Sequence, residues 1–257
     1  MSKKYNEVRK EEFLAYYNAG LNDYDISRKM HISDSTIFRW RKALGLPVTG
    51  TRVLSRNSFT EITEDEKEIL CGTLLGDSSL QYYPKFRHRA PSFKCDHGPK
   101  QEDYAKLLCS QLQSLGATLR KYTRIDKRNG KEYTSFCVKT KANPAFFSFY
   151  NELYSNGKKH ITESFLSGFT IKSLAYLYMD DGYADQKTAY ICTDNFDSQS
   201  KNTLVSYIEN KFNLHFKVVN HGKHYRIRLL QCDFERFKNL ISPYIIDCLK
   251  YKLDTVS

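Results

Sequence analysis

The sequence predicts an α+β protein in which a small all-α module is followed by two related repeats. Two observations support this prediction. Residues 11–45 show helical periodicity throughout, and from residue 63 onward the same order of helices and β-hairpins occurs twice. The 257 residues suffice for one domain of about 200 residues and a small module. The expected boundaries are residues 1–46 for the module, 47–62 for a linker, 63–163 for the first repeat and 164–257 for the second.

Three short helices are expected in the N-terminal module. The first runs over residues 11–19 and ends at Gly20, a common helix terminator. The second covers residues 22–30, and Ser33 is placed to cap the third. In that third helix an inward stripe at helical spacing is formed by Ile37, Trp40 and Leu44. The residues that then face outward are Ser35, Thr36, Arg39 and Lys42.

The segment DISRKMHISDSTIFRWRK (residues 25–42) resembles the helix-turn-helix of resolvases and many repressors, with His31 where that family often has glycine. A short polar and basic helix held against two others suits reading of the DNA major groove. A three-helix cap that binds protein is the alternative, which the basic outward face disfavours. Residues 47–62 contain Pro, Gly and Ser without a clear period and are expected to be a linker.

The first repeat opens with a capping box at Thr63–Glu66, from which a helix runs toward Asp77. A strand is expected around Arg87 and Arg89. The later elements are a helix over residues 101–115 that stops at Gly116, a hairpin of 118–125 and 135–141 that turns at Asn129-Gly130, and a helix over 143–154.

The second repeat follows the same order. Its expected elements are a helix that ends at Asp181, a strand over residues 190–193, a helix over 198–212, a hairpin of 216–220 and 224–230 that turns at His221-Gly222, and a helix over 232–240.

Period-two alternation in the hairpins separates cationic from apolar side chains. In the first repeat Arg120, Tyr122 and Arg124 oppose Leu119 and Ile125. In the second repeat His224, Arg226 and Arg228 oppose Tyr225, Ile227 and Leu229. An ordinary solvated face would more often mix both charge signs, so we expect these faces to contact DNA. Across the chain the expected DNA contacts are Ser35, Thr36, Arg39, Lys42, Arg87, Arg89, Arg120, Tyr122, Arg124, Lys139, Lys141, Lys187, His224, Arg226 and Arg228.

The net charge of +11 and the pI near 9.2 favour a polyanionic partner, because cations that neutralise phosphates release condensed counterions. The seven cysteines are scattered singly without a C-x-x-C pair, which disfavours a zinc site of the usual spacing and suits a reducing compartment. Cys95 and His97 are the nearest approach to a ligand pair. Neither a signal peptide nor a membrane-spanning run is apparent, so an intracellular protein of the cytoplasm or an organelle matrix is expected.

Two apolar segments end in a carboxylate at matching places, LCGTLLGDS (residues 70–78) and LAYLYMDDG (residues 174–182). If these helices pack side by side, Asp77 and Asp181 meet at two helix C-termini. There they repel each other and oppose the negative ends of the helix dipoles. A bound cation removes the conflict, and oxygen ligands suit Mg²⁺, for which Mn²⁺ can substitute.

Both segments resemble the LAGLIDADG motif of homing endonucleases, whose eighth position is the metal-binding acid; Asp77 and Asp181 occupy it. The resemblance covers nearly all of residues 63–257 and is strongest to single-chain, two-motif, intron-encoded members. It implies two pseudo-symmetric αββαββα repeats whose saddle-shaped antiparallel sheets straddle DNA. The motif departures are Ser78 for the final glycine, and Tyr176 and Met179 for small or acidic positions.

The resemblance also implies a site. Asp77 and Asp181 bind the metal ions, with backbone carbonyls of Gly76 and Asp180 as further ligands, although Asp180 can instead be a simple turn or capping residue. Lys159, or its neighbour Lys158, and Lys252 match by context the lysine that family members often carry in each half. The implied reaction is hydrolysis of both strands of double-stranded DNA across the minor groove, with 3′ overhangs, by a monomer without an obligate protein partner.

Two other functions fit the same scaffold. One is a catalytically silent transcription regulator, although such regulators usually lack the acids and carry their helix-turn-helix after the scaffold. The other is an intron maturase that binds RNA. A recombinase fits least, because no nucleophilic Ser or Tyr context is recognisable. The absence of splice-junction signatures favours a free-standing or intron-encoded protein over an intein.

Overall fold

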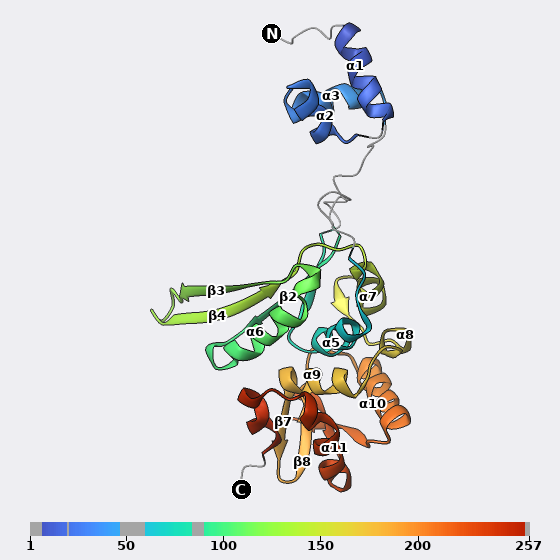
Figure 1. The fold of residues 1–257 in the computed structure, drawn as a ribbon. Helices are drawn as coiled ribbons and strands as arrows, with labels where there is room; N and C mark the ends of the chain where they lie inside the picture. Colours follow the sequence, from blue (N-terminus) through green and yellow to red (C-terminus); the bar gives the residue numbers. More distant parts are fainter. Residues whose placement is uncertain (1–6, 20, 47–59, 84–89, 255–257) are drawn as a thin grey trace. The chain divides into compact units, whose positions relative to one another are not determined.

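The computed structural model describes residues 7–19, 21–46, 60–83 and 90–254. They belong to two compact units, a small one with the N-terminal helices and a large one with both repeats (Figure 1). The predicted strand residues Arg87 and Arg89, and most of the predicted linker, lie outside the described residues. No helix within the described ranges is long and apolar enough to cross a bilayer.

The small unit consists of α1 (Glu7–Asn18), α2 (Asp23–Met30) and α3 (Asp34–Ala43). Its centre is formed by Phe13, Ile26 and Ile37, all with no exposed surface. Helix α2 ends at a residue in the left-handed conformation, His31, with φ of 51°. This conformation favours glycine, the residue that the helix-turn-helix family resembled by this segment often has at the turn.

The outward face of α3 contains the residues named from the sequence. Ser35, Arg39 and Lys42 are exposed, and Thr36 is half-buried. Ser33 occupies the predicted N-cap position of α3, but its hydroxyl contacts the side chains of Ser35 and Thr36 and makes no capping bond to a backbone N–H. Arg41 is buried, and its guanidinium pairs with Asp23 at 2.8 Å.

The large unit repeats one arrangement twice. The first copy contains α5 (Glu64–Leu75), β1 (Ser79–Gln81), β2 (Ser92–His97), α6 (Glu102–Gln111), β3 (Thr118–Ile125), β4 (Glu132–Lys139) and α7 (Phe146–Leu153). The short strands β5 (Tyr154–Ser155) and β6 (Lys158–Lys159) and the helix α8 (Glu163–Leu166) connect the copies. The second copy contains α9 (Ile171–Asp181), β7 (Gly182–Asp185), β8 (Thr188–Ile191), α10 (Ser198–Phe212), β9 (Phe216–His221), β10 (His224–Leu229) and α11 (Phe234–Ile241).

Each copy has a four-stranded antiparallel sheet with the same topology, β1-β2-β4-β3 in the first and β7-β8-β10-β9 in the second. The predicted αββαββα order is therefore confirmed in both copies. Strands β1 and β7 were not foreseen, because each is only three or four residues long and directly follows a motif helix. Strand β8 lies two residues earlier than predicted, at Thr188–Ile191.

Helices α5 and α9 lie side by side between the two copies (Figure 1). The capping box starts α5, with Thr63 and Glu66 bonded reciprocally. Gly72 allows the close approach, because a Cβ there would overlap the carbonyl oxygen of Ser173 and lie 2.7 Å from Cβ of Tyr176. One continuous core joins both copies across this pair. Ile62, which the sequence placed in the linker, is part of that core, so the large unit begins before Thr63.

The expected apolar face of the hairpins is only partly correct. Ile227 and Leu229 are fully buried, but Tyr225 is exposed, and Ile125 is 66% exposed. The outer part of the β3–β4 hairpin extends past α6, so neither of its faces meets the core there (Figure 1). The second hairpin turns at Gly222-Lys223, one residue later than predicted, because His221 pairs with His224.

Candidate metal centre and DNA-binding surface

The C-terminal ends of α5 and α9 place three carboxyl groups together. The backbone N–H of Asp77 donates to Oδ2 of Asp180 at 3.2 Å. Asp180 lies across the end of α5, where a Cβ on Gly76 would come within 2.5 Å of that same oxygen. Gly76 is therefore required for the approach of Asp180. The side chain of Asp180 is a buried part of the helix interface and is neither a turn nor a capping residue.

The three acids differ in exposure, and the two on α9 have raised pKa values. Asp77 is exposed, Asp181 is half-buried and Asp180 is 6% exposed. Burial, and after it the charge of Asp77, raises the pKa of Asp181 to about 7. Burial and the charge of Asp77 likewise raise the pKa of Asp180. The cluster thus gathers negative charge that the protein alone compensates poorly, a pattern typical of a cation site.

Two lysines lie at equivalent places in this cluster. Nζ of Lys159, on β6, donates to the carbonyls of Gly76 and Ser78 at 3.2 and 2.6 Å. Nζ of Lys252 donates to the carbonyls of Met179 and Asp180 at 2.6 and 2.8 Å.

Each ammonium group is thus held at the end of one motif helix. Burial lowers the pKa of both lysines, and the carboxylates of Asp180, Asp181 and Asp77 oppose this shift. Lys158, the alternative to Lys159, is exposed and makes no such contact among the described residues.

The donor set fits a hard divalent cation. Asp77 and Asp181 offer carboxylate oxygens at the motif ends, and Oδ1 of Asp180 is buried without a hydrogen-bond partner among the described residues. The carbonyls of Gly76 and Asp180, which the sequence suggested as ligands, each accept from a lysine and retain a second lone pair. Carboxylate and carbonyl oxygens are the ligands that Mg²⁺ prefers.

His97 is a neighbour of this centre that the sequence did not assign to it. One ligand atom each from Asp77, His97 and Asp180 lies within 4.8 Å of the other two. The sequence signal for His97 was only its spacing from Cys95, whose Sγ lies 2.9 Å from Nε2 of the imidazole. Their proximity to the motif acids depends on the pairing of β2 with β1, the strand that follows α5, which no local pattern reveals.

The open face of the first sheet contains four of the predicted DNA contacts. Register places Arg120, Tyr122 and Arg124 on the same face as Lys139, which pairs with Thr118 at the start of β3. Lys94 and Gln81 join this face but were not predicted. Lys141 lies beyond the end of β4, and its aliphatic stem passes over Gly116.

The second sheet presents a matching face. His224, Arg226 and Arg228 alternate along β10, and Lys217 pairs with Arg228 on β9. Two stacked tyrosines that the sequence analysis missed, Tyr183 and Tyr190, share this face with ring centroids 5.1 Å apart. Arg226 donates to the hydroxyl of Tyr183 at 3.2 Å and pairs with Asp194 at 3.5 Å. The predicted contact Lys187 lies exposed in the turn between β7 and β8.

The double variant Arg120→Ala/Arg124→Ala is expected to bind DNA about tenfold or more weakly and to reduce the slope of log affinity against log salt by about two. The reason is that each phosphate contact contributes about one counterion to this slope. Fluorescence anisotropy of a labelled duplex at several salt concentrations measures both effects. Lys106→Ala on α6 is the control, because Lys106 pairs with Glu102 and Asp103 on a helix that covers the other face of the sheet. Equal salt slopes for the wild type and the double variant would show that this face does not contact the DNA phosphates.

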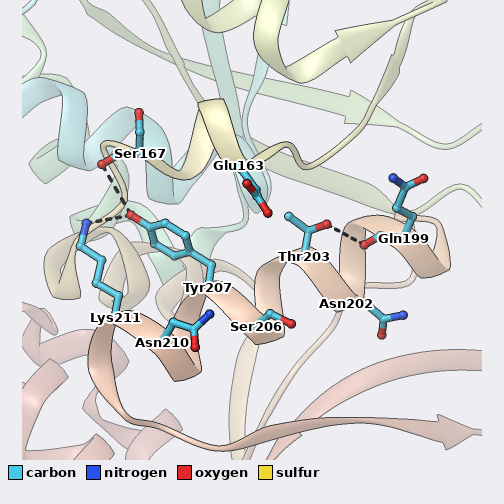
Figure 2. Close-up of a pocket in the computed structure, with 9 residues that line it drawn as sticks. All are labelled: Glu163, Ser167, Gln199, Asn202, Thr203, Ser206, Tyr207, Asn210 and Lys211. Carbon is cyan, nitrogen blue, oxygen red and sulfur yellow. Dashed lines mark hydrogen bonds between the residues drawn. The ribbon is translucent and has the colours of Figure 1, made fainter.

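A cavity of about 1010 Å³ lies elsewhere, between α8 and α10 (Figure 2). Its lining is mainly uncharged and polar, with Glu163 facing Thr203 across it (Figure 2). Lys211 is held at one end by bonds to the carbonyl of Phe169 and the hydroxyl of Tyr207, at 2.7 and 2.8 Å. None of the motif acids or sheet cations lines this cavity, so it has no part in the chemistry above.

Comparison with known proteins agrees with a metal centre and a DNA-binding surface. The model of the LAGLIDADG DNA endonuclease family matches residues 67–237. The chain is 26% identical over 213 residues to DNA endonuclease I-ChuI of Chlamydomonas applanata, covering 75% of this chain and 95% of that protein. It is 24% identical over 206 residues to the probable intron-encoded endonuclease 1 of Wickerhamomyces canadensis, covering 77% and 87%.

Other relatives are longer proteins. The chain is 26% identical over 231 residues to Protein RecA of Mycolicibacterium flavescens, covering 83% of this chain but 52% of that protein. It is 25% identical over 222 residues to Protein RecA of Mycobacterium shimoidei, covering 80% and 50%. The chain thus spans about half the length of these relatives. Among solved structures, the homing endonuclease I-WcaI bound to its DNA recognition sequence has the same fold, with a TM-score of 0.71, 24% identity and coverage of 84% of this chain and 98% of that one.

Proposed function

The chain belongs to the LAGLIDADG DNA endonuclease family, and we propose that it is a site-specific homing endonuclease that hydrolyses both strands of a long double-stranded DNA target. The observation that carries the proposal is the pair of matched acids, Asp77 and Asp181, at the ends of two helices packed side by side. The relatives named DNA endonuclease I-ChuI and probable intron-encoded endonuclease 1 support it. Cutting at the uninterrupted locus would promote the spread of the element that encodes the protein.

Asp77 and Asp181 would hold divalent ions, Mg²⁺ with Mn²⁺ as a substitute, together with the carbonyls of Gly76 and Asp180. When bound, such ions supply Lewis-acid charge at the scissile phosphate and lower the pKa of a bound water. The chain's own contribution is to fix the two acids at a distance set by the helix packing. Gly76 is part of that arrangement, because it leaves room for Asp180 beside Asp77.

The lysines supply positive charge close to the acids. Lys159 and Lys252 are each held by two backbone carbonyls, so their ammonium groups stay in place without pairing to the motif carboxylates. A positioned ammonium group stabilises the charge that develops on phosphate oxygens during hydrolysis. The equivalent positions of Lys159 and Lys252 fit a centre that hydrolyses both DNA strands with the same kind of residues.

The two cationic sheet faces would bind the duplex on either side of the centre. Arg120, Arg124 and Lys139 belong to the first face, and Arg226 and Arg228 to the second. Stacked Tyr183 and Tyr190 add planar surface for sugar and base contacts beside Arg226. Because both copies are in one chain, we propose a single-chain, two-motif enzyme that acts as a monomer without an obligate protein partner.

The N-terminal module would add contacts outside the cleavage site. Helix α3 exposes Ser35, Arg39 and Lys42, side chains that can reach phosphates and base edges in a major groove. We therefore propose that the module is a helix-turn-helix that extends the recognised sequence.

The test is incubation of the purified chain with DNA of the uninterrupted host locus that flanks its gene. Cleavage in Mg²⁺ at one position, with no cutting of an unrelated plasmid, is the expected result. Tight binding of that locus without cutting in any divalent metal would indicate a transcription regulator. Splicing of the host intron RNA by the protein, without DNA cleavage, would indicate a maturase.

A further inference from the structure

The two halves of the metal centre differ in the residues that surround their acids. In the first copy Ser79 pairs with Lys94, so Ser78, the residue after Asp77, lies opposite Cys95. In the second copy Gly182, the residue after Asp181, pairs with Ile191. Cys95 and Ile191 are therefore equivalent. Two positions further along the strand, the first copy has a histidine where the second copy has a threonine.

Among the described residues the second copy has no imidazole at the matching position, and the carboxylate near Asp181 that it adds, Asp194, pairs with Arg226 at 3.5 Å. Thr193, the counterpart of His97, is buried, and its hydroxyl donates to the carbonyl of Tyr225 at 3.2 Å. Gly76, the counterpart of Asp180, has no side chain. Asp181 therefore has neither an imidazole nor a second carboxylate supplied by the opposite copy.

In the first copy, the motif acid Asp77 has both an imidazole and a second carboxylate beside it. His97 is 2% exposed and Asp180 is 6% exposed. Nδ1 of His97 and Oδ1 of Asp180 make no hydrogen bond of good geometry among the described residues, although the side chain of Gln101 lies near the imidazole and the hydroxyl of Tyr104 near the carboxylate. Buried polar atoms in a folded protein nearly always have a partner, and one that lacks it requires an explanation such as an ion. With Asp77, these side chains bring ligand atoms within 4.8 Å of one another.

We propose that Asp77, His97 and Asp180 form a mixed nitrogen and oxygen site for a first-row transition ion such as Mn²⁺ or Co²⁺, whereas the Asp181 half is an oxygen-only site that suits Mg²⁺. This inference deepens the proposed function and rests on it for the role of the motif acids. Imidazole nitrogen shifts the preference of a site away from Mg²⁺ toward transition metals.

Cys95 positions the imidazole. Its Sγ lies 2.9 Å from Nε2 of the ring. With the ring proton on Nε2 and directed at this sulfur, the lone pair of Nδ1 is left for a metal ion. Metal-binding histidines are usually oriented in this way through their second nitrogen.

The experiment is titration of the metal-free full chain with Co²⁺, Mn²⁺ and Mg²⁺. Calorimetry measures binding of each ion, and visible absorption reports the ligands of Co²⁺. We expect one Co²⁺ to bind tightly in the wild type. His97→Gln should weaken this step by about tenfold to a hundredfold and change the absorption spectrum, with Mg²⁺ binding nearly unaltered. Thr193→Val is the matched control at the equivalent position and should leave Co²⁺ binding unchanged.

Pulsed electron paramagnetic resonance of the Mn²⁺-loaded wild type gives a second readout that does not depend on a variant folding. Coupling to an imidazole nitrogen, lost in His97→Gln, supports the site, and the absence of that coupling overturns it. Equal Co²⁺ affinity and spectra for the wild type and His97→Gln would also overturn it. These measurements use no DNA, so their outcome does not depend on whether the protein is a nuclease. A chain that binds Co²⁺ through His97 but never cuts DNA would contradict the proposed nuclease function and leave the metal site supported.

Discussion

Replacing Asp77 or Asp181 with Asn is expected to slow DNA cleavage by about a thousandfold or more while leaving DNA affinity within a few-fold of the wild type. A metal ion contributes several kcal/mol to stabilising the transition state, and each 1.4 kcal/mol or so is a factor of ten in rate. Neither acid lies on the cationic sheet faces, so affinity should persist. Single-turnover cleavage and anisotropy with the same duplex measure the two quantities.

The matched control for these variants is Asp103→Asn, which removes an exposed acid on α6 that pairs with Lys106. It should cleave like the wild type. Cleavage by either motif variant at the rate of Asp103→Asn would show that its acid is not part of the centre. A parallel loss of affinity and cleavage would instead show that the substitution disturbed the fold or the DNA surface.

The variant Gly72→Ala is expected to destabilise the large unit by about 3 kcal/mol, because overpacking of a tight interface typically costs 1–3 kcal/mol or somewhat more. The added Cβ overlaps the backbone oxygen of Ser173, which cannot move without separating α5 from α9. In a unit of this size the melting temperature should fall by roughly 10 °C. Thermal unfolding followed by circular dichroism measures the shift.

Gly168→Ala is the matched control for this substitution. A Cβ at Gly168 meets only Sγ of Cys71 at 3.6 Å, an ordinary contact, so its melting temperature should stay within about 2 °C of the wild type. A small shift for Gly72→Ala, comparable to that of Gly168→Ala, would mean that the two helices pack less closely than described.

Most helices and strands could be predicted from the regular periodicity of apolar residues in the sequence. Helix α10 spans Ser198–Phe212 as predicted, and β3 spans Thr118–Ile125 as predicted. The motif acids were identifiable because each ends an apolar helix at the same place in its copy. Strands β1 and β7 were not, because three or four residues carry too little alternation to separate a strand from a turn.

The parts that sequence reasoning missed depend on distant segments meeting. Asp180 appeared as a neighbour of Asp181, yet its side chain lies against the other motif helix, where only Gly76 leaves space. His97 reaches the acids because β2 pairs with β1, the strand that directly follows α5. The burial of Arg41 likewise depends on a partner in another helix, Asp23.

Strand-resolved cleavage of the host-locus duplex tests the central claim, that Asp77 and Asp181 form one metal-dependent centre for two strands. Each strand is labelled separately and followed in Mg²⁺ and in EDTA. The account predicts that the wild type cuts both strands in Mg²⁺, leaving 3′ overhangs, and that EDTA stops both cuts. Cutting that persists in EDTA, or that never reaches the second strand, would contradict it.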